Sequence, residues 1–121
     1  MHIIENRGSE KPNTHDVKVN SGLRQLLVNV NVREEPTEGI EGAETQYVWD
    51  SIVFAPGEHE YDVIVYALIR YKYPQSKMES IVNNYLADPD NEKYASVFKE
   101  MQTYRAESKS LANAIISDLE K

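Results

Sequence analysis

Apolar and polar residues alternate along residues 26–33 of the chain. Leu26, Val28 and Val30 begin the apolar series, Val32 ends it, and the positions between them are mainly polar. Because successive side chains of a strand point to opposite faces, this alternation predicts a strand with Val32 on its buried face. Its polar outer face is typical of an antiparallel sheet that is covered on one side only.

A second strand is predicted at residues 46–54, where both faces carry apolar residues and Tyr47 and Trp49 share one face. The acidic segment 34–44 separates the two strands, contains no positive charge and is expected to be a solvated loop. Two strands joined by one such segment predict a long antiparallel β-hairpin.

The beginning of the chain carries weaker signals. Residues 17–19 could add a third, short strand before the turn-forming residues that follow them. Residues 1–16 are polar and are expected to form a flexible arm, with at most a short strand at residues 2–5.

Three helices are predicted after the strands. The first covers residues 58–73 and carries Arg70 and Lys72 in its last turn, which suits the helix dipole, and Pro74 ends it. Its apolar residues form two stripes at helical spacing. We therefore expect this helix to be covered on two sides.

The second and third helices each begin with a capping signal. Ser76 with Glu79 three residues later forms a capping box, and Asp88 before Pro89 resembles an N-cap followed by a first-turn proline. The third helix is expected to be long and to reach residue 119. Its apolar seam, spaced alternately by three and four residues, consists of Tyr94, Val97, Met101, Tyr104, Ser108, Leu111 and Ile115.

These elements predict an α+β fold. It consists of an antiparallel β-hairpin, which a third short strand could join, followed by three helices, the last one long. The 121 residues are expected to form a single domain. Within it, a β region at 17–56 follows the arm, and a helical region occupies 58–119.

Composition removes several classes of function. The chain has no cysteine, which excludes disulfides and thiolate metal sites. Its 20 acidic and 13 basic residues give a net charge of −7, which argues against direct binding of duplex nucleic acid. No apolar run is long enough to span a bilayer, so we expect no membrane contact, and the absence of cysteine favours the cytosol.

No residue pattern predicts catalysis. His2, His15 and His59 are not spaced as a metal pair on one helix face, and the paired carboxylates stand at expected helix starts. The sequence contains neither a nucleophile elbow nor a phosphate-binding loop. We therefore expect no catalytic residue, no metal and no cofactor, and interpret the protein as a non-enzyme.

Tyrosine is the unusual residue type. Seven of the eight tyrosines fall between Tyr61 and Tyr104, where they could be core residues with rim hydroxyls or part of a protein interface. The second interpretation gives a candidate interface on the first and third helices: Tyr61, Ile64, Tyr66, Arg70, Tyr73, Tyr94, Met101, Tyr104 and Leu111.

One stretch carries a resemblance. It has a Tyr-Asp start at Tyr61, the run Ala-Leu-Ile-Arg ending at Arg70, and a Tyr-Arg pair at Tyr104 and Arg105. Over residues 58–110 this resembles small uncharacterised proteins encoded by phages and prophages of gut bacteria. The resemblance implies a mobile genetic element, a role in virion assembly or in dealing with the host, and a place in the cytoplasm of a host cell or in a virion. It supplies no functional residues.

The leading hypothesis is a non-enzymatic phage or prophage accessory protein that acts through protein–protein contacts, in virion assembly and as a homo-oligomer. The first alternative is an acidic inhibitor of a host defence protein, which mimics nucleic acid or blocks a basic cleft. Its candidate acidic surface consists of Glu34, Glu35, Glu38, Glu41 and Glu44.

A second alternative is a small-molecule binding protein. Its pocket would lie between Tyr47, Trp49 and the first helix, with Arg70 or His59 as the polar group. No motif supports this alternative.

Overall fold

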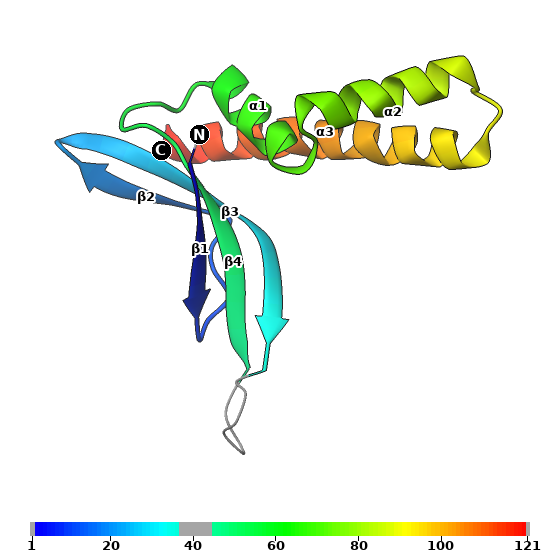
Figure 1. The fold of residues 1–121 in the computed structure, drawn as a ribbon. Coiled ribbons are helices and arrows are strands. Elements are labelled where there is room, and N and C mark those ends of the chain that lie inside the picture. Colours follow the sequence, from blue (N-terminus) through cyan, green and yellow to red (C-terminus); the bar gives the residue numbers. More distant parts are fainter. Residues whose placement is uncertain (1, 37–44, 121) are drawn as a thin grey trace. The chain divides into compact units, whose positions relative to one another are not determined.

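The protein has four strands followed by three helices in the computed structural model, which describes residues 2–36 and 45–120 (Figure 1). This confirms the α+β class and the long last helix, with four strands in place of two or three. The chain divides into two compact units, Met1–His59 and Glu60–Lys121, here termed the sheet unit and the helical unit. The expectation of a single domain stays a prediction.

The sheet unit is a four-stranded antiparallel sheet in the order β1-β4-β3-β2. The predicted hairpin is present as β3 and β4, and a strand occurs at the third position that the sequence left open. The strands are β1 (His2–Gly8), β2 (His15–Asn20), β3 (Leu23–Glu35) and β4 (Gln46–Val53).

A two-residue turn joins β2 to β3. Ser21 and Gly22 both have positive φ, at 56° and 80°, and Asn20 pairs with Leu23 across the turn. Positive φ at both central residues matches the right-handed twist of the flanking strands, as in a type I′ turn. The turn therefore fixes the register of the β2–β3 ladder.

The prediction of a flexible arm at residues 1–16 is wrong for most of that segment. All seven residues of β1 pair with β4, from His2 opposite Val53 to Gly8 opposite Tyr47. The short strand that was anticipated at residues 2–5 is present and extends to Gly8, and its full length was missed because the charges of Glu5 and Arg7 hide the strand pattern in the sequence. In the structure these two side chains lie on one face of the sheet and form ion pairs.

A β-bulge changes which face β3 presents. From Val30 to Arg33 the strand advances three positions, whereas β4 advances two, from Asp50 to Val48. Asn31, inside the bulge, has φ 54°, in the left-handed region that asparagine tolerates better than most residues. The extra residue exchanges the faces of the strand. Val32 is therefore 40% exposed, and its predicted place on the buried face is wrong.

The middle of β3 is buried on both faces. Leu27 and Asn29 are buried, as are Leu26 and Val28 on the other side, so the predicted polar outer face is wrong here. The buried apolar side chains of the sheet unit are Leu26, Leu27, Val28, Val48, Ile52 and Phe54.

The helical unit contains α1 (Tyr61–Lys72), α2 (Gln75–Ala87) and α3 (Glu92–Leu119). Helices α1 and α2 follow one another along α3 (Figure 1), and both contact it. At 28 residues, α3 is about 42 Å long at the usual helical rise. Of the residues of its predicted seam, Met101, Ser108 and Ile115 are buried and the other four are half-buried.

Two predicted caps are wrong. Helix α2 begins at Gln75 with Pro74 at its N-cap, so Ser76 lies inside the first turn. Asp88 ends α2 by donating its backbone N–H to the carbonyl of Asn84. The N-cap of α3 is Asn91, whose side-chain oxygen accepts hydrogen bonds from the N–H groups of Lys93 and Tyr94. Helix α3 therefore begins after Asn91, three residues later than the predicted cap at Asp88.

Candidate interaction surfaces

The nine predicted interface residues fall into three groups by exposure. Ile64, Tyr73 and Met101 are buried, at 0%, 5% and 0% exposure, so they belong to the interior. Tyr66 is the exposed member, at 62%. The half-buried members are Tyr61, Arg70, Tyr94, Tyr104 and Leu111. Tyr66 is thus the candidate best placed for an outside contact, and Arg70 lies one turn further along α1.

Tyr66 and Arg70 interact with each other one turn apart on α1. The guanidinium carbon of Arg70 lies 5.0 Å from the centroid of the Tyr66 ring, a cation–π contact. This contact holds the two side chains together at the surface. Tyrosine and arginine are also the residue types most enriched among energetically dominant interface positions.

A cavity of about 240 Å³ opens beside this pair, within the helical unit. It brings Arg105 of α3 to the same site as Arg70, a proximity that no spacing in the sequence could reveal. We refer to it as the Arg70–Arg105 cavity; its lining consists of Asp62, Val65, Tyr66, Ile69, Arg70, Met78 and Arg105.

Both arginines of this cavity bond to neutral groups. Arg70 donates from Nη1 to the Tyr73 carbonyl at 3.3 Å and from Nη2 to the Gln75 side chain. Its buried Nε has no hydrogen-bond partner among the described residues. Arg105 donates to Oε1 of Gln102 at 3.4 Å. Within residues 2–36 and 45–120, neither guanidinium forms an ion pair, although Asp62 lines the same cavity.

Tyr104 has a structural role that the sequence did not reveal. Its hydroxyl donates a hydrogen bond of 2.6 Å to the carbonyl of Leu68, which ties α3 to α1. Its ring lies 5.5 Å from that of Tyr73, and the amino group of Lys72 lies 5.0 Å from its centroid. Burial raises the pKa of Tyr104, and burial together with Glu100 raises the pKa of Tyr73.

Replacing Tyr104 with phenylalanine is expected to lower the free energy of unfolding by about 1 kcal/mol at neutral pH, because one hydrogen bond is lost. An unfolded tyrosine ionises near pH 10, whereas the raised pKa keeps folded Tyr104 neutral to higher pH. The stabilisation of the folded state by the Tyr104 hydroxyl is therefore complete below pH 10 and is lost as the pH rises through the pKa of the folded state. The difference in the free energy of unfolding between wild type and Tyr104→Phe should shrink between pH 8 and pH 11. Urea unfolding at the two pH values measures it.

Tyr66→Phe is the matched control, because its ring is exposed. The free energy of unfolding of Tyr66→Phe should stay close to that of wild type at pH 8 and at pH 11. A Tyr104→Phe difference that is constant with pH would contradict the role given to burial.

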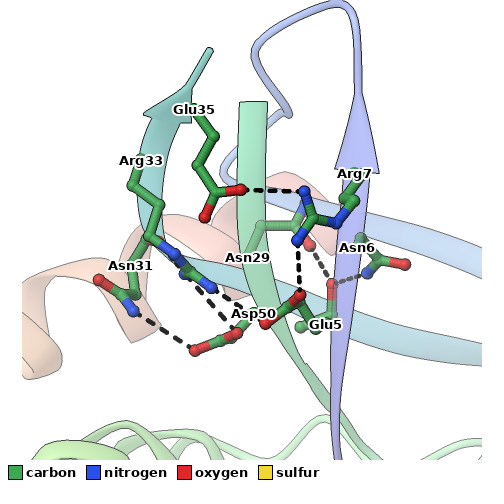
Figure 2. A network of polar contacts seen from close by, with 9 residues as sticks. Glu5, Asn6, Arg7, Asn29, Asn31, Arg33, Glu35 and Asp50 are labelled. Carbon is green, nitrogen blue, oxygen red and sulfur yellow. Dashed lines mark hydrogen bonds and ion pairs between the residues drawn. The ribbon is translucent and has the colours of Figure 1, made fainter. Parts of the chain in front are cut away.

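One face of the sheet unit carries a network of ion pairs (Figure 2). Arg7 of β1 contacts Glu5 at 3.5 Å and Glu35 of β3 at 2.9 Å. Arg33 of β3 contacts Glu5 at 3.1 Å and Asp50 of β4 at 3.8 Å. Most of these groups are well exposed, so each pair adds little stability. The network brings together three strands that lie apart in the sequence.

The predicted acidic surface is only partly within the described residues. Glu34 is exposed on β3, and Glu35 is already engaged by Arg7. The remaining members, Glu38, Glu41 and Glu44, lie outside the described residues. The described part of this surface is thus partly neutralised by its own arginines.

A chain of hydrogen-bonded polar side chains crosses the sheet on its opposite face. Its member Ser51 follows Asp50 of the ion-pair network in β4, and successive side chains of a strand point to opposite faces. Asn6 of β1 donates to Oγ of Ser51 at 2.7 Å, and Ser51 donates to Oδ1 of Asn29 in β3 at 2.7 Å. Asn29 in turn donates to Oδ2 of Asp16 in β2 at 2.9 Å. The chain therefore links all four strands. No pattern in the sequence indicated it, because Asn29 stands at one of the alternating polar positions of β3.

Among the described residues, no three histidine, cysteine, aspartate or glutamate side chains are grouped so that they could hold a metal ion. In the same part of the chain, no helix combines the length and apolarity needed to cross a membrane.

Comparisons of the chain with protein-family models, with curated proteins and with solved structures found no match.

Proposed function

We propose that the protein is a non-enzymatic accessory protein that binds another protein through the Arg70–Arg105 cavity and the exposed ring of Tyr66. The observation that carries this proposal is the pair of guanidinium groups at one cavity, neither of which has a carboxylate partner among the described residues. The resemblance over residues 58–110 supports virion assembly in a phage or prophage as the setting.

The partner is expected to present an acidic side chain. A guanidinium group binds a carboxylate with two parallel hydrogen bonds, which makes arginine well suited to this contact. The cavity of about 240 Å³ is smaller than the usual range for drug-sized ligands, and it suits a single inserted side chain better. Tyr66 would then cover the side of that contact and exclude water from it.

The proposal is tested by capture with purified virion proteins encoded beside the natural gene. Wild type is compared with Arg105→Gln and Tyr66→Ala, and with Lys109→Gln, an exposed position on α3 outside the cavity. We expect Arg105→Gln to weaken the captured complex about tenfold, the loss for one charged contact, and Tyr66→Ala to weaken it by a similar factor through the lost ring contact. Lys109→Gln should leave the complex unchanged.

Circular dichroism of each variant shows whether the helical unit is still folded. Capture that survives both cavity variants, or no capture of any of these proteins, would overturn the proposal. If Lys109→Gln still captures the partner and the two cavity variants do not, the contact is specific to the cavity. General attraction between charged surfaces would be weakened by Lys109→Gln as well.

A further inference from the structure

Strand β2 lies at an edge of the sheet and pairs only with β3 among the described strands. Two of its apolar side chains are exposed, Val17 at 41% and Val19 at 79%. An edge strand with exposed apolar side chains is a template for pairing with another chain. The sheet unit therefore has a surface that could bind a further strand.

The ladder shows which backbone groups face this open edge. The N–H of Asn29 donates to the carbonyl of Thr14 at 2.9 Å, so Thr14 directs its backbone groups towards β3. In an antiparallel pair every second residue does the same, which includes Asp16 and Lys18. The alternate residues Val17 and Val19 therefore direct their N–H and C=O groups outwards.

We propose that a second copy of this chain binds here, with the two β2 strands antiparallel and Val17 opposite Val17. This register uses the outward N–H and C=O groups of both Val17 residues. It also places Asp16 of each copy opposite Lys18 of the other. These positions are the non-hydrogen-bonded pairs of the new ladder, where opposing side chains approach most closely.

Charge selects this register over its neighbours. A shift by one residue would present backbone groups that already bond to β3, so only shifts by two keep the ladder. One such shift places Asp16 opposite Asp16, and the other places Lys18 opposite Lys18. Like charges directly opposite each other are destabilising. The sequence Asp16-Val17-Lys18 is thus complementary to itself in one antiparallel register, which favours a second copy over an unrelated strand.

Single cysteines test the register, because the natural chain has none. In the proposed dimer the Cα atoms of the two Val17 residues are about 5.5 Å apart, within the range of a disulfide. We expect Val17→Cys to form a covalent dimer on mild oxidation. Val19→Cys is the control: it is more exposed, but its two copies would be about 13 Å apart along the strands.

A proline at the same position tests the backbone contacts. Because the N–H of Val17 points away from β3, Val17→Pro removes a hydrogen bond of the dimer and none of the β2–β3 ladder. Light scattering over a range of micromolar concentrations should show a dimer for wild type and a monomer for Val17→Pro. Lys18→Asp, which places like charges opposite at two positions, should raise the dimer dissociation constant at least tenfold.

A wild-type monomer throughout this range overturns the proposal. So does a dimer whose affinity is unchanged in Lys18→Asp, or cross-linking by Val19→Cys as fast as by Val17→Cys. If Val17→Pro does not fold, the Lys18→Asp and cysteine results decide. The edge shares no residue with the Arg70–Arg105 cavity, so this proposal and the proposed function can fail separately.

Discussion

Replacing Asn29 with alanine should lower the free energy of unfolding by about 2–4 kcal/mol, because it removes the centre of the polar chain across the sheet. Asn29 accepts a hydrogen bond from Ser51 and donates to Asp16 and to the carbonyl of Asn13. Ser51 is only 1% exposed, so water cannot replace the lost acceptor. Urea unfolding measures the change.

A double-mutant cycle with Ser51→Ala supplies the control. The double variant should be less destabilised than the sum of the two single variants, because it has no orphaned hydroxyl. Strictly additive effects would show that the hydrogen bond between Asn29 and Ser51 contributes little.

Replacing Met101 with alanine should lower the free energy of unfolding by about 2–5 kcal/mol, the range for truncating a fully buried side chain. Met101 lies in the middle of the seam of α3 and is 0% exposed. The loss has two parts, the transfer of apolar surface and the cavity that remains. Thermal or urea unfolding, followed by circular dichroism of the helices, measures it.

Met101→Leu is the matched variant. It keeps most of the volume and should cost less than about 1.5 kcal/mol. If alanine and leucine have the same effect, the site does not depend on filled volume, and the interior position of Met101 is contradicted.

The sequence predicted best where apolar residues repeat at a regular interval. The alternation around Val28 predicted β3, and the seam around Met101 predicted α3. Of strand β1 only residues 2–5 were anticipated, because Glu5 and Arg7 interrupt the apolar pattern, and their pairing with Arg33 and Glu35 exists only once three strands are assembled. The bulge at Asn31 was missed because it arises from the pairing of β3 with β4.

The candidate surface was predictable only in part. Tyr66 and Arg70 could be named from α1 alone, because neighbours on one helix are set by its periodicity. Arg105 joins them through the packing of α3 on α1, which depends on tertiary contacts. The sequence also could not separate Ile64 and Met101, which are interior, from Tyr66, because all three lie on apolar stripes.

The bulge in β3 also determines how the chain responds to changes in its length. Deletion of Asn31 would restore simple alternation and exchange the faces of the residues that follow, which would carry Arg33 away from Glu5 and Asp50. Replacement of Asn31 by glycine would leave those contacts in place, because glycine adopts positive φ freely. At this position the number of residues is constrained more strictly than their identity, so alignments of related chains should show substitutions here and no gaps.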